Sequence, residues 1–284
     1  MTARPMAEQF PERNNANINL SWANISATGM RASNQDAMGE AQQDDMVCFV
    51  MSDGAGGHEG GEVAARIVVD TVLSEFLRES SFGVRAMHSY AECAMARVAQ
   101  GKHLAPRQHD MSATIATVLI DQSNRQALWA HLGDTRIYLF RHDKLHRVTK
   151  DHSVAQQFID AGYGQADQLR LHPQRNILFA AVGAEGGTEA AVTSEAVKIE
   201  DGDAFLVCTD GFWEWVLEAD MEATLAAART SQEWLIAMGR IADANVNAAQ
   251  KLRDNYSVFA IWVIEPAAAG SPMCPDAFDP IRKK

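Results

Sequence analysis

The sequence contains no long hydrophobic run. Its longest apolar stretches, such as residues 113–120, have about eight residues, whereas a helix that spans a membrane requires roughly 20. The opening stretch, MTARPMAEQFPERNNANIN, is polar and lacks the apolar core of a secretory signal. We therefore expect no membrane span and a cytoplasmic location.

Cysteine is also scarce and shows no paired spacing. The four cysteines are Cys48, Cys93, Cys208 and Cys274, and none is followed six residues later by the arginine that a simple cysteine-phosphatase site would require. Cys48 and Cys208 lie inside apolar, strand-like runs. This pattern predicts buried free thiols and not a disulfide framework or a zinc site.

Positive charge is the third shortage. The chain has 25 Lys and Arg against 37 Asp and Glu, a formal net charge of −12, and no basic stripe of the kind that a nucleic-acid backbone requires. We therefore expect no nucleic-acid partner. An anionic substrate would need a local source of positive charge on this acidic protein.

What is present indicates one folded unit. With 47% apolar and 22% charged residues, the composition is that of a globular protein with a sizeable core. Residues 1–16 and 266–284 are polar or proline-rich with little periodicity, so we expect flexible ends on a domain that covers residues 17–265.

The apolar periodicity of that domain separates strands from helices. Alternating or continuous apolar runs predict strands at residues 18–26, 45–52, 113–120, 126–131, 136–141, 145–148, 204–208 and 256–264. Helical spacing predicts helices at residues 62–77, 84–99, 151–161, a short one from 212, and 231–251. Because strands are grouped with strands and helices with helices, we expect antiparallel sheets covered by helices, an α+β sandwich.

Two of the predicted strands end in the same way, with an aspartate followed by glycine. Asp53-Gly54 follows residues 45–52, and Asp210-Gly211 follows residues 204–208. Three further aspartates stand at similar strand edges: Asp36, Asp134 and Asp254. Clustered carboxylates cannot all stay ionised unless a cation compensates them, and oxygen ligands favour Mg²⁺ or Mn²⁺ over zinc. The sequence therefore predicts a divalent-metal centre.

A phosphate-binding loop is the alternative for the glycine-rich stretch GAGGHEGGE after Asp53. A P-loop requires a lysine that this stretch lacks, and Glu59 and Glu62 would stand where phosphate should bind. A dinucleotide fingerprint fits poorly too, since the sheets are not expected to be parallel. The metal interpretation is the better one.

Seven ordered motifs in residues 18–264 resemble those of the PPM family, the metal-dependent protein phosphatase 2C type, and its bacterial members in particular. They are RASNQDA, MSDGAGGHEGGEVAA, HLGDTRIYLF, VTKDHS, HPQRNILFAAVG, FLVCTDGFWEWV and RDNYSVFAIWV. The resemblance implies a four-layer α-β-β-α sandwich, with a central antiparallel β-sandwich flanked by helix pairs. It also implies hydrolysis of phosphoserine and phosphothreonine by a metal-bound water at a binuclear Mn²⁺ or Mg²⁺ centre.

The resemblance further implies a role for each motif residue. Asp53 would bridge the two ions, the carbonyl of Gly54 would bind one ion, and Asp210 and Asp254 would bind the other. Asp36 would act directly or through water, and Asp134 would hold a third, looser ion. Arg31 would grip the substrate phosphate with its forked guanidinium. Residues 151–183, extending to about 193, would form a flap over the cleft.

Three positions depart from the family pattern. Ala55 stands where many eukaryotic members have a histidine that is proposed as the general acid, and His58 does not inherit that role by proximity. Gln35 replaces a glutamate ligand of some members, and Ser112 replaces a usual glycine. The proton donor therefore stays open, with a metal-bound water as one candidate.

Simpler interpretations remain for several residues. Asp134 could only cap a turn, and Arg31 could be a surface ion-pair partner. His131 and His152 are expected to be hydrogen-bonded structural residues, and Trp213 and Trp215 to serve packing.

Two functional hypotheses follow. The first is a monomeric serine/threonine phosphatase that acts on phosphorylated proteins and opposes a bacterial kinase, with a secretion-system role resting on analogy alone. The second is an inactive phosphoprotein-binding or scaffold domain with the same fold. The complete ligand set favours the enzyme.

Overall fold

The computed structural model describes residues 17–55, 60–104, 110–184, 186 and 188–265. The two ends that were predicted to be flexible, 1–16 and 266–284, lie outside the described residues, as do His58, Glu59 and Cys274.

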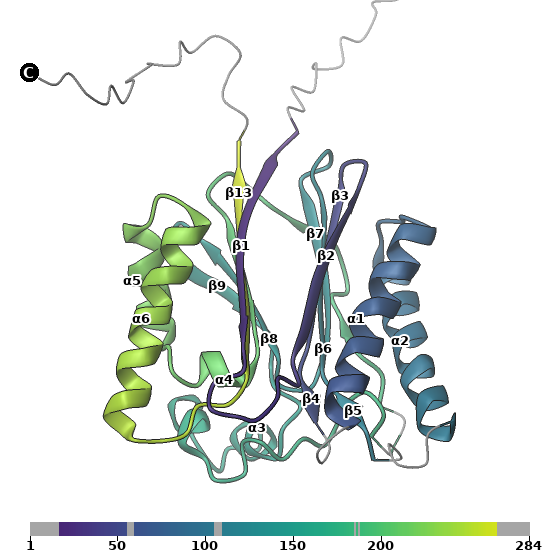
Figure 1. Cartoon of the computed structure of the whole chain (residues 1–284). Coiled ribbons are helices and arrows are strands. Elements are labelled where there is room, and N and C mark those ends of the chain that lie inside the picture. The colour runs from purple at the N-terminus through teal and green to yellow at the C-terminus, as the bar shows by residue number, and fades with distance from the viewer. Residues whose placement is uncertain (1–16, 56–59, 105–109, 185, 187, 266–284) are drawn as a thin grey trace, which may run out of the picture.

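Two antiparallel sheets face each other and form the centre of the molecule (Figure 1). The first sheet has five strands in the order β1 (Asn19–Ala27), β13 (Tyr256–Ile264), β12 (Ala204–Cys208), β8 (Arg136–Arg141) and β9 (Lys144–Val148). The second has the order β10 (Ala191–Val192), β7 (Gln126–Leu132), β6 (Ile115–Asp121), β3 (Met46–Ser52) and β2 (Ala37–Gln43), and β11 (Val197–Lys198) also pairs with β7. A separate ladder joins β4 (Gly54–Ala55) to β5 (Ser112–Ala113).

Helices cover the outer face of each sheet (Figure 1). The second sheet is covered by α1 (Gly60–Arg78) and α2 (Val84–Leu104), and the first by α5 (Glu218–Ala227) and α6 (Ser231–Ala249). Three short helices lie near one end of the sandwich: α3 (Val154–Asp160), the 3₁₀ helix η2 (Ala166–Leu171) and α4 (Asp210–Trp213). The predicted four-layer α+β sandwich is confirmed.

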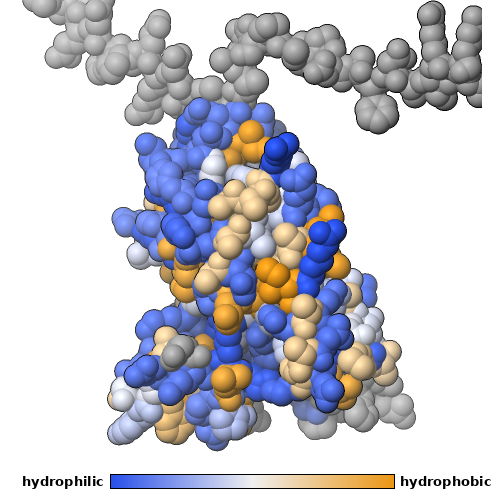
Figure 2. All heavy atoms as spheres, turned by 90° about the vertical axis from the view of Figure 1, so that its left-hand side faces the viewer, coloured by the Kyte–Doolittle hydropathy of each residue, from blue (hydrophilic) through white to orange (hydrophobic). Residues whose placement is uncertain are grey.

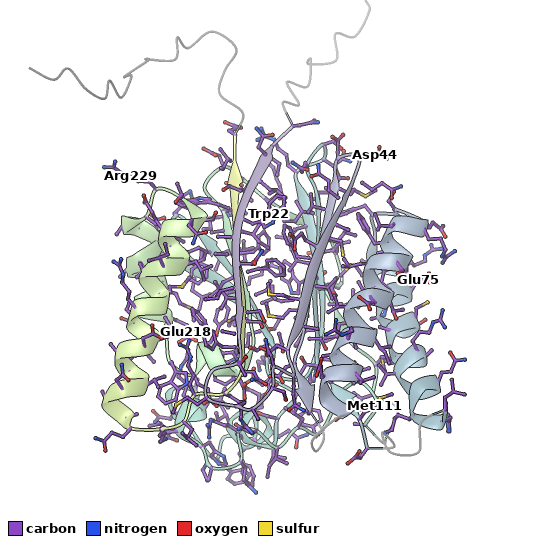
Figure 3. All side chains as sticks on the ribbon, viewed as in Figure 1. Trp22, Asp44, Glu75, Met111, Glu218 and Arg229 are labelled. Carbon is purple, nitrogen blue, oxygen red and sulfur yellow. The ribbon has the colours of Figure 1, made fainter. Side chains whose placement is uncertain are left out.

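Apolar side chains fill the space between the sheets (Figure 3). The ring of Phe49 on β3 makes edge contacts with Trp22 on β1 and Phe259 on β13, with ring centroids 5.4 Å apart in both pairs. Every residue of β6 is buried, because helices cover one of its faces and the other sheet covers the second. This explains why its sequence reads as a continuous apolar run instead of an alternating one.

Each outer layer has its own apolar interface with the sheet beneath it. On the α5 and α6 side, the fully buried Trp234 of α6 makes an edge contact with Phe140 of β8. The outer face of this layer is mixed, with hydrophobic groups scattered among hydrophilic ones (Figure 2).

The predicted elements are present. The sequence analysis missed β2, a polar edge strand with the sequence AMGEAQQ, and α5, which follows α4 as a separate helix. It also missed the two-residue strands β4, β10 and β11 and the 3₁₀ helix η2. The predicted helix at 151–161 begins only at Val154, because the Ser153 side chain accepts a hydrogen bond from the Gln156 amide (3.2 Å) and caps it.

None of the helices among the described residues combines the length and apolarity that crossing a bilayer demands. Cys48, Cys93 and Cys208 are free thiols; the first and last are fully buried, whereas Cys93 is only partly covered.

Candidate active site

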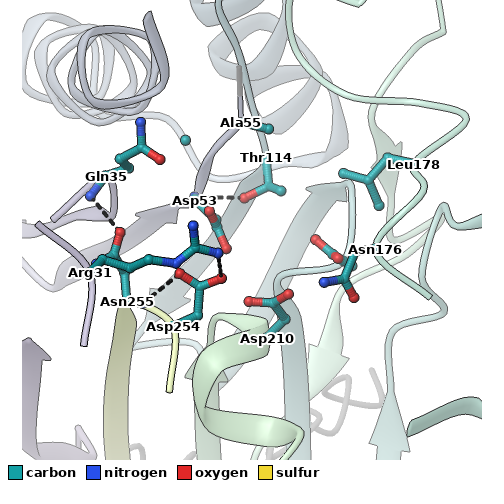
Figure 4. Close-up of a pocket in the computed structure, with 12 residues that line it drawn as sticks. Arg31, Gln35, Asp53, Ala55, Thr114, Asn176, Leu178, Asp210, Asp254 and Asn255 are labelled. Carbon is teal, nitrogen blue, oxygen red and sulfur yellow. Dashed lines mark hydrogen bonds and ion pairs between the residues drawn. The ribbon is translucent and has the colours of Figure 1, made fainter. Parts of the chain in front are cut away.

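One cavity of about 340 Å³ lies at the end of the sandwich where α4 and β4 are found (Figures 1 and 4). Its lining includes six of the seven residues that were predicted to form the site: Arg31, Asp53, Gly54, Asp134, Asp210 and Asp254. The seventh, Asp36, does not line the cavity but is buried close enough to its carboxylates to raise their pKa. The structure therefore brings together residues from four separate connections between strands, with Gly54 in β4 beside them.

Asp53 is held by the strand ladder that begins beside it. Its backbone N–H donates to the side-chain oxygen of Thr114 (2.8 Å), and its carbonyl accepts from the Thr114 backbone N–H (2.8 Å). The Thr114 hydroxyl is in turn hydrogen-bonded to Thr135 (2.6 Å). Because both main-chain groups of Asp53 are engaged, its carboxylate projects into the cavity from a fixed backbone.

Crowding requires the glycines that follow Asp53 and Asp210. A Cβ on Gly54 would lie 2.2 Å from the carbonyl oxygen of Gly61, and one on Gly211 would lie 1.9 Å from that of Asn255. The first contact packs β4 against the start of α1, and the second packs α4 against the loop that carries Asp254. The Asp-Gly pattern thus lets neighbouring site segments approach at backbone distance.

Asp210 and Asp36 are linked through Thr209. Asp210 opens α4, and the preceding Thr209 donates a hydrogen bond from its hydroxyl to Asp36 Oδ2 (3.0 Å). Asp36 is 8% exposed, and its other oxygen, Oδ1, is buried without a hydrogen-bond partner among the described residues. A buried unpartnered carboxylate oxygen is costly in a protein interior unless a cation or water satisfies it.

Arg31 and Asp254 contact each other directly. Arg31 Nη2 lies 2.5 Å from Asp254 Oδ2, and the two side chains are 61% and 36% exposed (Figure 4). The other carboxylate oxygen of Asp254 accepts the Asn255 backbone N–H (2.8 Å). The predicted phosphate ligand and one predicted metal ligand are thus paired in this structure.

Asp134 lies in the connection between β7 and β8 and is 6% exposed. Its backbone carbonyl accepts a hydrogen bond from the indole Nε1 of Trp213 (2.9 Å). Its carboxylate faces the same cavity as those of Asp53 and Asp210, which a turn cap alone does not explain.

The buried carboxylates raise one another's pKa. Burial, followed by the charges of neighbouring aspartates, raises the pKa of Asp53 and Asp210 well above the ordinary value. Burial and the charge of Asp151 raise the pKa of Asp134 to about 7. For Asp36, burial raises the pKa to about 6 although hydrogen bonds oppose it.

The donor set fits a hard divalent cation. Several carboxylates, the unpartnered Asp36 Oδ1 and a nearby backbone carbonyl are all oxygen donors, the kind that Mg²⁺ and Mn²⁺ prefer. Within the described part of the chain, however, no three His, Cys, Asp or Glu side chains are gathered around one point as a closed metal site. The donor atoms suit such an ion, but the carboxylates do not converge on one point. This is expected where carboxylates repel one another and Arg31 engages Asp254.

The segment from 151 to 183 covers one side of the cavity. Asn176 and Leu178 line the cavity opposite Asp53 (Figure 4). The segment is tied to α4 by an ion pair between Arg175 and Glu214, with Nη2 2.9 Å from Oε2.

No histidine, lysine or cysteine lines the cavity among the described residues. Ala55 lines it, and its carbonyl accepts a hydrogen bond from the Ser112 hydroxyl (3.0 Å). His131 bonds to the Lys150 carbonyl (2.9 Å), and His152 accepts the Gly133 N–H (3.1 Å), so both are engaged in structural contacts as expected.

Sequence reasoning missed the residues that support the carboxylates. Thr114, Thr209, Asn176 and Asn255 were not singled out, and Trp213 was assigned to packing alone. Asn255 donates from its side chain to the carbonyls of Thr28 and Ser33 (both 2.8 Å), which positions the segment that carries Arg31. Thr209 and Asn255 stand directly beside Asp210 and Asp254 in the sequence, and for these two that adjacency was the available signal.

The raised pKa values predict an unusual pH dependence of stability. In the unfolded chain an aspartate titrates near 3.9, so between about pH 4 and 7 the folded state binds protons that the unfolded state has lost. This contribution is complete below pH 4 and is lost as pH rises through about 6 for Asp36 and about 7 for Asp134. In EDTA, we expect the melting temperature to fall between pH 5.5 and 8, measured by scanning calorimetry.

Removing one carboxylate from the cavity tests this explanation, and removing one on the surface serves as the control. Asp210→Asn should raise the melting temperature in EDTA at pH 8 and reduce its fall with pH, because one repelling carboxylate is gone. Asp70→Asn, at an exposed aspartate of α1, should leave both unchanged. A melting temperature in EDTA that rises or stays level over this pH range contradicts the electrostatic account.

Comparison with known proteins agrees with the fold. The family model described as protein phosphatase 2C matches residues 26–257. The serine/threonine phosphatase stp of Listeria innocua is 31% identical over 211 residues, which cover 72% of this chain and 82% of that protein.

Solved structures share the fold at lower identity. The Mycobacterium tuberculosis serine/threonine phosphatase PstP/Ppp superposes with a TM-score of 0.74 at 24% identity, covering 88% of this chain and all of that one. The catalytic domain of PstP in complex with two manganese ions gives a TM-score of 0.72 at 22% identity, covering 87% of this chain and 99% of that one. With its family model matched over most of the folded unit, this chain belongs to the protein phosphatase 2C family.

Proposed function

We propose that this protein is a metal-dependent protein serine/threonine phosphatase that hydrolyses phosphoserine and phosphothreonine in other proteins. The observation that carries the proposal is the convergence of Asp53, Asp134, Asp210 and Asp254 on one cavity that also contains Arg31. The names of the relatives, serine/threonine phosphatases, support the same reaction.

The metal ligands are assigned as follows. Asp53 would stand between two ions, with the Gly54 carbonyl on one and Asp210 and Asp254 on the other. Asp36 would contribute directly or through water, and Asp134 would hold a third, looser ion. The two manganese ions of PstP support Mn²⁺ or Mg²⁺ as the cofactor. When bound, such ions activate water for attack and neutralise charge on a phosphoryl group.

Arg31 would bind the phosphate of the substrate. It is the one cationic side chain that lines the cavity among the described residues, and its exposure leaves it free to turn from Asp254 toward an incoming anion. Its planar fork matches two phosphoryl oxygens. The same movement would release Asp254 to bind metal.

The surroundings of the cavity would control access and proton transfer. Residues 151–193 would act as the flap of a phosphatase domain spanning 17–265, with Asn176 and Leu178 facing the substrate. Ala55 and the other lining residues offer no histidine for protonation of the leaving group, so water in the cavity would supply that proton.

The alternative function is an inactive phosphoprotein-binding or scaffold domain. The full set of carboxylates favours turnover, because a module that only bound phosphate would gain nothing from buried like charges at that site. Phosphorylated proteins are the substrate class in either case. A partner kinase, a role in secretion, a monomeric state and a cytoplasmic location stay predictions.

Loss of a carboxylate should remove turnover. We expect Mn²⁺-dependent hydrolysis of p-nitrophenyl phosphate and of a phosphothreonine peptide by the wild type, and at least about a 10³-fold lower kcat for Asp53→Ala and Asp210→Ala, since each would disturb a shared metal centre. Asp70→Ala on α1 is the matched control and should retain full activity. Hydrolysis that does not depend on Mn²⁺, or that is unchanged in both variants, would contradict the proposed metal-dependent mechanism. No hydrolysis by the wild type would favour the scaffold.

Arg31 should act mainly on substrate binding. A hydrogen bond to a charged group contributes about 1.5–3 kcal/mol, so Arg31→Ala should raise KM for p-nitrophenyl phosphate roughly 10–100-fold. Arg31→Lys, which keeps the charge and loses the fork, should recover only part of this. Arg66→Ala, at an exposed arginine of α1, serves as the control. An unchanged KM in both Arg31 variants would assign Arg31 to a surface ion pair alone.

A further inference from the structure

Trp213 connects two of the site carboxylates through one turn of helix. It ends α4, the four-residue helix that Asp210 begins, and it is 1% exposed. Its indole Nε1 donates to the backbone carbonyl of Asp134 (2.9 Å). The same short helix therefore carries Asp210 and holds the main chain from which the Asp134 carboxylate projects.

The indole ring is itself fixed in place. The guanidinium of Arg136 lies over it, with Cζ 3.5 Å from the ring centroid, and that of Arg170 lies 5.4 Å away. Arg136 is held by two hydrogen bonds to Asp151, each 2.8 Å, and both of these side chains are almost fully buried. A ring stacked beneath a paired arginine has little freedom to rotate, so its N–H points at one place.

The Trp213 bond matters because it holds the Asp134 carbonyl directly. Gly133 adopts a φ of +107°, a conformation that only glycine enters readily, and its main-chain groups are hydrogen-bonded to His152. Asp134 follows at once, and its carbonyl is held by Trp213. Without the Trp213 bond, this carbonyl would lose its buried donor, and the Asp134 main chain would be free to shift relative to Asp210.

We propose that Trp213 is a positioning residue that fixes the Asp134 carboxylate relative to Asp210 and thereby sets the affinity for the metal ion that Asp134 binds. The inference rests on the proposed function, since it takes the carboxylates to be metal ligands. It goes beyond the assigned ligands because Trp213 does not line the cavity and acts through a backbone carbonyl. Supporting contacts of this kind change metal affinity by roughly 10–100-fold when they are removed.

Trp234 provides a matched control within the same protein. It is also fully buried, and its Nε1 also donates to a backbone carbonyl, that of Met221 (3.1 Å), but it lies on α6, and its acceptor Met221 does not line the cavity, whereas Asp134 does. Trp213→Phe and Trp234→Phe each remove one buried N–H donor and retain an aromatic ring. A general loss of stability would affect both variants, whereas a positioning role would affect only the first.

The test is isothermal titration of Mn²⁺ into each EDTA-stripped, dialysed variant, with folding checked by circular dichroism. We expect the weakest Mn²⁺ site of Trp213→Phe to lose affinity by at least about tenfold, and Trp234→Phe to match the wild type within about twofold. Equal affinities in all three proteins, or an equal loss in both variants, overturn the inference. A wild type that binds no Mn²⁺ overturns the proposed function as well, so the two failures are distinguishable.

A second measurement on the wild type covers the case in which Trp213→Phe does not fold. In ¹⁵N-labelled protein with the tryptophan signals assigned by triple-resonance spectra, Mg²⁺ should shift the indole N–H signal of Trp213 and leave that of Trp234 in place. The Trp213 signal should respond because its acceptor belongs to Asp134. A Trp213 signal that stays fixed while Mg²⁺ shifts backbone signals near Asp53 contradicts the positioning role.

Discussion

The mutual repulsion of buried carboxylates is the constraint on which the site depends. Asp53, Asp134 and Asp210 face one cavity with Asp36 behind them, and burial raises the pKa of all four. Their segments repel one another, so the fold must hold them together by other means. Backbone contacts at Gly54 and Gly211 and the hydrogen bonds of Thr114 and Thr209 supply that restraint. The stability of the sandwich thus opposes a local strain that a divalent cation would relieve.

Several carboxylates just outside the cavity are paired with arginines, so the unpaired negative charge is concentrated inside it. Three acids just outside the cavity have an arginine partner: Asp151 pairs with Arg136, Glu218 with Arg170, and Glu214 with Arg175. Inside the cavity, Arg31 is the single cationic lining residue of the described chain, and it engages only Asp254. On the proposed function, metal ions and Arg31 together would attract the anionic phosphate to this acidic protein. This resolves the apparent conflict between a net charge of −12 and an anionic substrate.

Much of this molecule could be predicted from its sequence because its main signals are local. The continuous apolar runs of β3, β6, β12 and β13 identify buried strands, and the repeated Asp-Gly after two of them identifies the carboxylates. The edge strand β2 was not predicted, because its sequence AMGEAQQ is polar and its residues are only partly buried. Two contacts were also not predicted: the bond from Trp213 to the Asp134 carbonyl and the pairing of Arg31 with Asp254. They join positions 79 and 223 residues apart and depend on which backbone groups the tertiary fold leaves available, which no local pattern encodes.

The central claim, that a divalent cation relieves the repulsion of these carboxylates and displaces the protons that their raised pKa favours, can be tested by counting the protons released on binding. Mn²⁺ would be titrated into the EDTA-stripped, dialysed protein at about pH 6.5 in buffers of different ionisation enthalpy, and the dependence of the heat on the buffer gives the number released. We expect a net release of protons with each bound pair of ions. The release should be smaller for Asp134→Asn, because this substitution removes a carboxyl whose pKa is raised to about 7. Binding heats that do not depend on the buffer would contradict it.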